Sequence, residues 1–429
     1  MNRHRDWVIG IVLVVVCFGG TRVAHAWGKG HRLIRLWAVQ RVPAALRSLV
    51  PREDWDRLCS DYTSLQDRHA GGNAAELDPY CLVPGVRLSL HDVNPAEPSF
   101  KAKRWYLERI IQQIRQGETD EAMKYLGVLC HWNEDPGCPS AHCSPVTEMQ
   151  LKQLLPPPPG KENLNYLYGY GGIADVGNYT IAEEPYQPRL LGTTLDEACT
   201  RIYQHQRLVR QRAAARIVPL VWDMLHGDGS QADVQRAAAA LENARHIADV
   251  IYTVLCLASE TFDEAETERL SQQPLTEWLP EFPGGRVGHP YYVTPFLVNQ
   301  SMDARRGLHP LRLTDTVADQ SIAHGFGMGA PLALNFPLAP AGVFARFTCR
   351  VGLHAEAGPE GEVAFAVVAN GQELARTRPL RGGEPGKRID VRLPESGLLT
   401  LTLQTIPTDA NASLRNLCVW AEPTLHRVE

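Results

Sequence analysis

Histidine and aspartate residues recur along the first third of the chain in an order that indicates metal binding. His131 and Asp135 are four residues apart, so a helix would place this imidazole and this carboxylate on one face. Imidazole nitrogens and carboxylate oxygens are ligands that suit zinc. Further candidate ligands of the same two types stand before and after this pair: His31, Asp67, His91 and His142.

Each candidate also has an ordinary structural explanation when it is taken alone. The pair of His131 and Asp135 fits a surface ion pair on a helix. His91 fits a loop histidine, and Asp67 fits a turn or a helix cap. The ordered combination is more specific than any of its members, so we predict a metal centre.

Residues 1–26 have the features of a secretory signal peptide. Two arginines precede an apolar stretch from Trp7 to Phe18, and the small residues Ala24 and Ala26 suit a cleavage site. The apolar stretch is shorter than the roughly 20 residues of a membrane-spanning helix, although an uncleaved anchor is the alternative. We therefore expect a secreted or periplasmic protein whose processed chain begins at Trp27.

Processing at this point would add a chelating group. The free α-amine and the carbonyl oxygen of Trp27 can bind a metal together, and His31 stands four residues later in the string Trp-Gly-Lys-Gly-His. With this start and the ligand order that follows, residues 27–260 resemble the superfamily of zinc-dependent phospholipases C and single-strand-specific nucleases. The resemblance implies an all-helical domain, up to three zinc ions, and hydrolysis of a phosphodiester in a phospholipid or a single-stranded nucleic acid by zinc-activated water.

The resemblance also implies a role for each candidate. Asp67 would orient or deprotonate the attacking water as well as bind metal. Asp135 would bridge two zinc ions. Trp27 and His31 would also bind the first ion. Asp67, His91 and His131 would also bind the second ion. A third ion would be held by His142.

The third zinc site departs from the pattern of the superfamily, in which a histidine and an acidic residue four positions apart follow soon after. Here His246 and Asp249 come about a hundred residues after His142 and are three positions apart. We predict them as ligands, with a helix-surface pair as the alternative. His205 is a rival candidate. A site with two zinc ions, or a degenerate site, stays open.

Charge and aromatic residues bear on the substrate. The net charge of −5 argues against a broad basic face for duplex nucleic acid. Lys29 and Arg68 could neutralise a phosphate or lie on the solvated surface. The aromatic run Tyr166–Tyr170 could stack on a base, line a lipid groove or pack locally.

Two classes of element must position these residues. Helical periodicity covers segments such as Leu107–Ile114, 118–135, 194–225 and 232–260, and Pro136 should end the helix that carries His131. From about residue 285 short alternating runs bounded by Gly and Pro indicate strands. We predict an all-α domain at 27–260, a linker at 261–286, and a jelly-roll-like β-sandwich at 287–429.

Several strings in the C-terminal part resemble the NPCBM family of β-sandwich modules. They are 322–329 (IAHGFGMG), 344–353 (FARFTCRVGL), 363–371 (VAFAVVANG) and 419–423 (VWAEP). The resemblance implies binding of a polysaccharide, with His324 and Trp420 as candidate sugar contacts; a core or turn role is the alternative for both.

Export would permit disulfides among the cysteines. The chain has ten cysteines, and removal of the signal peptide would leave nine, so at least one thiol stays unpaired. Cys138 and Cys143 are close enough to close a small loop, and Cys59/Cys81 and Cys349/Cys418 are plausible longer pairs, although the spacing does not determine the connectivity.

Together these features predict an exported zinc-dependent phosphoesterase that a carbohydrate-binding module targets. The alternative is a non-catalytic envelope or carbohydrate-binding protein whose helical domain is a degenerate hydrolase. The displaced pair of His246 and Asp249 favours the alternative, and the ordered ligands from Trp27 to His142 favour the enzyme.

Overall fold

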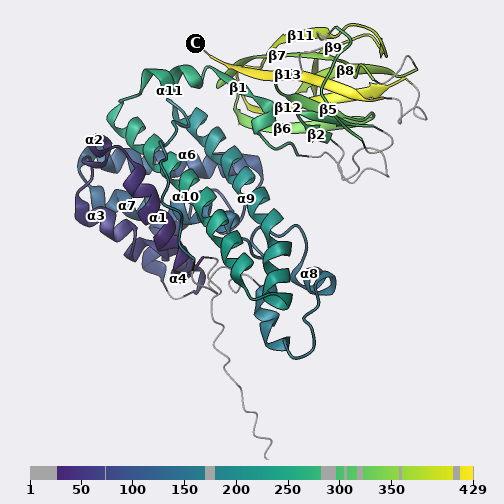
Figure 1. Cartoon of the computed structure of the whole chain (residues 1–429). Coiled ribbons are helices and arrows are strands. Elements are labelled where there is room, and N and C mark those ends of the chain that lie inside the picture. Colours follow the sequence, from purple (N-terminus) through teal and green to yellow (C-terminus); the bar gives the residue numbers. More distant parts are fainter. Residues whose placement is uncertain are drawn as a thin grey trace, which may run out of the picture.

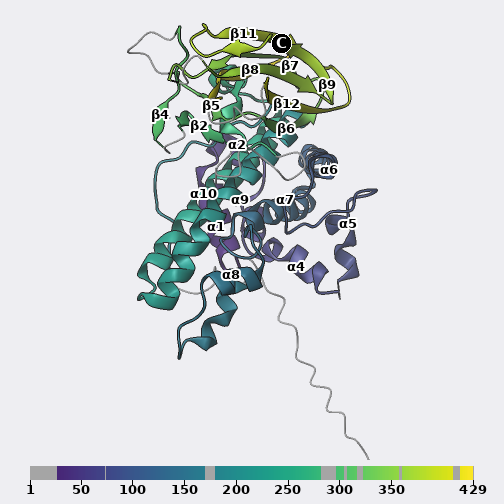
Figure 2. The ribbon, with the colours of Figure 1, turned by 90° about the vertical axis from the view of Figure 1, so that its right-hand side faces the viewer.

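The computed structural model describes residues 27–428 except 73, 170–178, 282–295, 304–306, 316–321, 357–359 and 409–415. The predicted signal peptide and Tyr170 therefore lie outside the described residues. A helical domain is followed by an antiparallel β-sandwich, which lies at one end of the long helices (Figures 1 and 2). This confirms the predicted order of the two fold classes.

Long helices form the framework of the N-terminal domain, and the predicted helical segments are present. The helix of His131 ends at Glu134, one residue before the predicted end, and Pro136 lies in the 3-10 turn that follows. The helices are α1 (Gly30–Arg41), α2 (Ala44–Arg47), α3 (Arg52–Leu58), α4 (Leu65–Ala70), α5 (Asp78–Cys81), α6 (Ala96–Gln116), α7 (Thr119–Glu134), α8 (Glu148–Leu154), α9 (Leu195–His226), α10 (Ser230–Ser259) and α11 (Glu264–Arg269). Short 3-10 turns are η1 (Asp61–Thr63), η2 (Ala75–Leu77), η3 (Asp135–Gly137), η4 (Glu162–Tyr168) and η5 (Leu275–Glu277).

Caps at two helix ends show why the framework begins and ends where it does. The Thr194 hydroxyl accepts a hydrogen bond from the backbone N–H of Glu197 at 3.3 Å, which satisfies a free donor at the start of α9. Gly117 ends α6 in the left-handed conformation, with φ of 78°. No helix among the described residues has the length and apolar character needed to cross a membrane.

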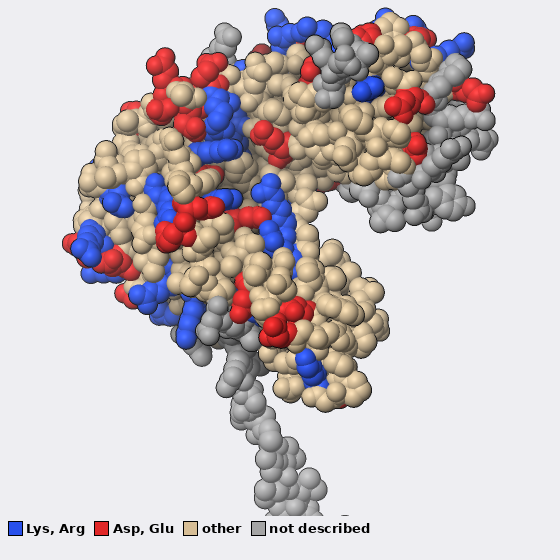
Figure 3. Space-filling model, in the orientation of Figure 1, with Lys and Arg blue, Asp and Glu red and all other residues tan. Residues whose placement is uncertain are grey.

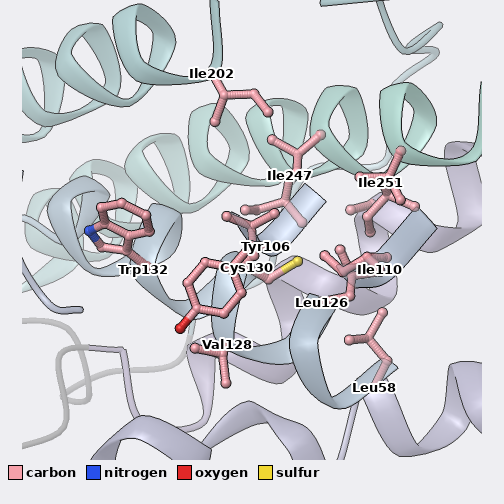
Figure 4. Packing of buried hydrophobic residues seen from close by; sticks show 14 of the residues in the cluster. Leu58, Tyr106, Ile110, Leu126, Val128, Cys130, Trp132, Ile202, Ile247 and Ile251 are labelled. Carbon is pink, nitrogen blue, oxygen red and sulfur yellow. The ribbon is translucent and has the colours of Figure 1, made fainter. Parts of the chain in front are cut away.

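The core of the helical domain lies around α7, the helix that carries His131. Figure 4 shows Ile247 and Ile251 of α10 pointing toward Ile110 of α6 and toward Leu126 and Cys130 of α7. All five side chains are fully buried. Burial of each large aliphatic side chain contributes roughly 1.5–3 kcal/mol, so apolar packing holds α7 firmly between its neighbours.

The C-terminal part folds into two facing antiparallel sheets. Its strands are β1 (Gln272–Pro274), β2 (Phe296–Val298), β3 (Gln300–Met302), β4 (Leu308–Pro310), β5 (Gly325–Met328), β6 (Leu332–Pro340), β7 (Phe344–Leu353), β8 (Glu362–Ala369), β9 (Gln372–Arg376), β10 (Leu380–Arg381), β11 (Lys387–Arg392), β12 (Leu398–Pro407) and β13 (Cys418–Arg427). One sheet has the order β11-β7-β13-β5-β2 with β1 paired to β13, and the other has the order β10-β8-β12-β6 with β9 paired to β8. The small pair β3-β4 stands apart.

The segment 261–286, predicted as a linker, is folded over its described residues. It carries α11 and β1, and β1 pairs antiparallel with β13 of the sandwich. Leu275 and Trp278 are buried in the sandwich core. The sandwich therefore begins before the alternating pattern becomes visible, because its first strand is only three residues long and gives no periodicity to read.

The predicted disulfides are wrong, since the nine cysteines of the described chain are buried and none of them forms a disulfide. Cys138 and Cys143 belong to different hydrophobic clusters. In the sandwich, Cys418 stands in register with Leu353 of β7 and not with Cys349. Burial raises the pKa of Cys143 to about 12, so these thiols act as small apolar side chains.

Candidate metal centre

Four separate segments bring the predicted ligands to one buried place in the helical domain. His31 lies in the first turn of α1, and Asp67 lies in α4. The end of α7 and the start of η3 supply His131 and Asp135. His91 comes from the irregular segment before α6. The structure therefore joins residues that are up to about a hundred positions apart in the sequence.

Two overlapping groups of three side chains have the spacing of metal ligands. In each group the potential ligand atoms lie within 4.8 Å of one another: His31, Asp67 and His131 in the first, and His91, His131 and Asp135 in the second. His131 belongs to both groups. Its Nε2 lies 3.2 Å from Asp135 Oδ2 and 3.6 Å from Asp67 Oδ1, so it stands between the two carboxylates.

The remaining contacts close the cluster. His31 Nε2 is 3.4 Å from Asp135 Oδ1, and His91 Nδ1 is 2.6 Å from Asp135 Oδ2. The rings of His31 and His131 are stacked with centroids 4.2 Å apart. Asp135 is thus the carboxylate that all three imidazoles approach.

Hydrogen bonds fix which nitrogen of each stacked ring faces the cluster. Glu134 Oε2 lies 2.6 Å from His31 Nδ1, and the Thr63 carbonyl lies 2.7 Å from His131 Nδ1. Both rings therefore turn Nε2 inward. The two Nε2 atoms and Asp135 Oδ1 are buried and have no hydrogen-bond partner within the part of the chain that the structure describes. A metal ligand held by its second ring nitrogen has this arrangement.

Glu134 and Arg35 support the centre and were missed by the sequence reasoning. Arg35 Nε donates to Glu134 Oε1 at 2.9 Å, and its other nitrogens donate to three backbone carbonyls. Burial opposes ionisation of Glu134, but Arg35 and His31 outweigh it and lower the pKa of Glu134 to about 2. Two features of the sequence could have indicated these residues: Glu134 directly precedes Asp135, and Arg35 lies four residues after His31 on α1.

Charge at the centre favours a cation. Burial works against a charged His131, yet the carboxylates of Asp135 and Asp67 outweigh it and raise the pKa of His131 to about 9. His131 and His91 in turn hold the pKa of Asp135 well below its usual range in spite of burial. A buried site in which carboxylates attract positive charge this strongly also suits a divalent metal ion.

Trp27 is seated against the same residues. Its side chain is fully buried and its Nε1 donates to the Glu134 carbonyl at 2.8 Å. Its carbonyl accepts from the N–H of Gly30 at 2.7 Å, at the start of α1. A Cβ on Gly30 would meet the Trp27 ring at 3.0 Å, so the glycine at position 30 allows the ring to pack closely against the start of α1.

The predicted third site is not assembled, since none of its members belongs to a three-ligand group among the described residues. His142 lies at the edge of the centre, with Nδ1 3.9 Å from Asp92 Oδ1. His246 lies on α10, and its Nε2 contacts Asn133 Oδ1 at 3.1 Å. Asp249 accepts from the Tyr186 hydroxyl and the Arg189 N–H at 2.9 and 2.8 Å. His246 and Asp249 face a separate cavity, which they share with His205.

The secondary candidates have ordinary surroundings. Lys29 is exposed, and Arg68 forms a surface ion pair with Glu76 at 3.6 Å. In the aromatic run, Tyr166 is exposed while Tyr168 is buried.

In the sandwich, Trp420 is fully buried against Phe365 with ring centroids 5.5 Å apart. It therefore takes the core role that was the alternative to sugar contact. His324 is half-buried.

The comparison with protein-family models finds a match in the C-terminal part of the chain. Residues 287–426 match the family model of the NPCBM/NEW2 domain, so the C-terminal sandwich contains an NPCBM domain. No curated protein sequence matches the chain.

Solved structures similar to this chain include two clostridial toxins. The alpha-toxin of an avian Clostridium perfringens strain is 13% identical, with 92% of this chain and 86% of that chain covered and a TM-score of 0.32. Clostridium absonum alpha toxin is 9% identical, with 94% of this chain and 96% of that chain covered and a TM-score of 0.31.

Carbohydrate-binding modules are also similar to part of the chain. The CBM51 of C. perfringens GH95, solved with methyl-galactose, is 16% identical, covers 36% of this chain and 99% of its own, and has a TM-score of 0.29. Only 31% of the matched C. perfringens ZmpB structure is spanned by this chain. The activity proposed below rests on the side chains of the metal centre.

Proposed function

We propose that the helical domain is a zinc-dependent phosphoesterase that hydrolyses phosphodiesters. One observation supports this above all: the inward Nε2 atoms of His31 and His131 and the Oδ1 of Asp135 converge while buried and without hydrogen-bond partners among the described residues. A buried polar atom without a partner costs roughly 1–3 kcal/mol. A metal ion would satisfy all three atoms at once.

The donor set fits zinc. Three imidazoles and two carboxylates are ligands that zinc accepts, and Glu134 and the Thr63 carbonyl hold two of the rings in place. Bound zinc supplies Lewis-acid chemistry, since it polarises phosphate oxygens and lowers the pKa of water. The ligands would be His31, Asp67, His91, His131 and Asp135.

Protein groups have separate tasks in the proposed reaction. Asp67 is the carboxylate of the first ligand group, 3.6 Å from His131 Nε2, and it also lies 3.9 Å from His91 Nδ1 of the second group. We assign it to orient the attacking water and accept its proton. Asp135 lies close to all three imidazoles and keeps these rings in fixed positions relative to one another. The apolar packing around α7 excludes bulk water from their far side.

Export and processing are part of the proposal. Cleavage after Ala26 would convert the backbone nitrogen of Trp27 into a free amine, four residues before His31 in the chain. The buried Trp27 ring, bonded to the Glu134 carbonyl at 2.8 Å, would then anchor the new terminus. The protein would be secreted or periplasmic. Its NPCBM domain would bind a polysaccharide and keep the phosphoesterase close to it.

The second candidate function is a non-catalytic carbohydrate-binding protein with a degenerate hydrolase domain. The separation of His142 from His246 and Asp249 favours it, because a third ion would lack a complete ligand set. The two intact groups that share His131 favour the enzyme, since a degenerate site would not be expected to preserve them.

The test compares the processed chain beginning at Trp27 with two variants. His131→Ala removes the shared ligand, and His226→Ala removes an exposed histidine at the end of α9 as the matched control. We expect bound zinc in the parent and in His226→Ala. His131→Ala should lose zinc and about 100-fold or more of its hydrolysis of bis(p-nitrophenyl) phosphate.

Phosphatidylcholine vesicles and single-stranded DNA are then offered to the active protein to separate the two phosphodiester classes. Full zinc content and full hydrolysis in His131→Ala would refute the proposed centre. A parent protein that holds zinc but hydrolyses none of the three phosphodiesters would support the non-catalytic alternative.

A further inference from the structure

A second polar cavity lies between α9 and α10, which run side by side in Figure 1, and it shares no residue with the two ligand groups of the metal centre. Its volume is about 520 Å³. The side chains that line it include Arg189, His205, Arg212, Arg245, His246 and Asp249.

His246 presents an unused acceptor at this cavity. Only 3% of its surface is exposed. Asn133 Nδ2 donates to the Leu129 carbonyl at 2.8 Å, so Asn133 Oδ1 is the acceptor that faces His246 Nε2 at 3.1 Å. Nε2 therefore carries the ring proton, and Nδ1 is left with its lone pair. No described residue gives this Nδ1 a hydrogen-bond partner.

Three guanidinium groups reach the cavity from three segments. Arg189 precedes α9, Arg212 lies on α9 and Arg245 lies on α10. Arg212 is 4.0 Å from Glu242, but Glu242 is already paired with Arg216 at 2.8 Å.

The other two guanidinium groups differ in their pairing. Arg245 pairs with Glu184 while its Nε stays unbonded in the described structure. Across the described ranges Arg189 has no carboxylate oxygen within ion-pair distance.

The lining also holds three carboxyl groups: Glu242 pairs with Arg216 at 2.8 Å, Asp249 accepts from the Arg189 backbone N–H at 2.8 Å, and Glu277 accepts from Gln273 Nε2 at 2.8 Å. Within the described residues no ion pair joins Asp249 or Glu277 to one of the three guanidinium groups, which leaves these groups available to an anion.

His205 responds to the positive charge of the arginines. Burial lowers the pKa of His205, and the fields of four arginines, Arg189 and Arg212 among them, lower it further to about 3. The imidazole is consequently neutral and adds no positive charge of its own. It lies beside His246 with ring centroids 6.0 Å apart, so the cavity offers neutral imidazoles next to guanidinium donors.

We propose that this cavity binds a small phosphorylated polyol. Its phosphate group would lie among Arg189, Arg212 and Arg245, because guanidinium groups approaching from several directions match the oxygens of a tetrahedral dianion. A hydroxyl group of the same molecule would donate to the bare His246 Nδ1. Binding here depends neither on the metal centre nor on the phosphoesterase activity proposed above.

Glycerol 3-phosphate is the probe, and its binding to the full-length protein is measured by calorimetry. Arg189 and Arg212 are both exposed, so the double variant R189A/R212A should fold, which circular dichroism checks. We expect this variant to bind the probe about tenfold or more weakly. The matched control R52A/R388A removes two exposed arginines elsewhere and should bind as the parent does. His131→Ala should also bind as the parent does.

Three outcomes would overturn the proposal. The first is an absence of saturable binding by the parent up to about 10 mM probe. The second is equal affinity in the parent and R189A/R212A. The third is loss of binding in His131→Ala, which would place the probe at the metal centre. Inorganic phosphate is the comparison ligand: weaker binding than the probe supports the hydroxyl contact with His246, and equal binding refutes it.

Discussion

At the scale of single residues, the metal centre depends on groups that hold the ligands as much as on the ligands. Glu134 contacts His31 Nδ1 at 2.6 Å and Arg35 Nε at 2.9 Å, all within a buried site. One carboxylate therefore orients an imidazole and neutralises a buried guanidinium. A residue with two such tasks affects both metal affinity and stability.

We predict that Glu134→Gln weakens zinc binding by about 10- to 100-fold, because the amide no longer increases the basicity of His31. The same change leaves Arg35 buried without its charge partner, which should lower the free energy of unfolding by about 3–5 kcal/mol. Zinc competition titrations and urea unfolding measure the two effects. Glu108→Gln on the exposed face of α6 is the control. Parental zinc affinity in Glu134→Gln would contradict the role given to this carboxylate.

At the scale of elements, a buried lysine joins α6 to α7 and α9. Lys103 is fully buried, its Nζ donates to Gln206 Oε1 at 3.0 Å, and it lies 3.5 Å from the centre of the Trp132 ring. Burial lowers the pKa of Lys103 to about 7. The folded pKa is thus below the value of about 10.4 that an exposed lysine has.

This difference predicts a pH dependence of stability. Between about pH 7 and pH 10 the unfolded chain keeps the proton that folded Lys103 has lost, so the free energy of unfolding should rise with pH, by at most about 1.4 kcal/mol per pH unit. Lys103→Met should abolish this rise. Urea unfolding at several pH values measures it, with Lys101→Met on the exposed side of the same helix as the control. An unchanged rise in Lys103→Met would disprove the explanation.

At the scale of the whole molecule, the helical domain and the sandwich share a polar junction at the start of α9. Arg201 is buried and donates to Gln273 of β1 at 2.6 Å and to Glu197 at 3.1 Å. Gln204 Nε2 donates to the Pro337 carbonyl of β6 at 2.5 Å. Because β1 pairs with β13, α9 is tied to both sheets of the sandwich.

We predict that Arg201→Met uncouples the two domains. It leaves Glu197 buried without its nearest cation, so stability should fall by about 3–5 kcal/mol. Scanning calorimetry should show one transition for the parent and two separated transitions for the variant. Arg388→Met on an exposed strand of the sandwich is the control. A single transition at the parental temperature would mean that the junction does not couple the domains.

The charge on the molecular surface agrees with the net charge of the sequence, which argued against a broad basic face for duplex nucleic acid. Basic and acidic side chains are interspersed over the face seen in Figure 3, with no broad basic region on it. Local charge at the metal centre and in the cavity of Arg189 is therefore what distinguishes possible ligands, because the mixed surface provides little long-range steering.

The sequence by itself determined the two fold classes, the helices around His131, and the residues that form the two groups with the spacing of metal ligands. These features are carried by local patterns: helical periodicity, the stop at Pro136, and alternation in the strands from β7 onward. The ligands His31, Asp67, His91, His131 and Asp135 could be named because their residue types and order are specific even before their distances are known.

Only the tertiary structure decided how these residues are supported and which predicted partners meet. Glu134 and Arg35 support His31 through contacts across about a hundred residues, and neither periodicity nor spacing encodes such contacts. The separation of His142 from His246 follows from the packing of α10 against α7, which places His246 behind Asn133. The described cysteines form no disulfide, although Cys59 and Cys81 share one hydrophobic cluster and Cys349 and Cys418 share another. Pairing across the fold depends on positions in space, and one sequence specifies those only through the packing of the whole chain.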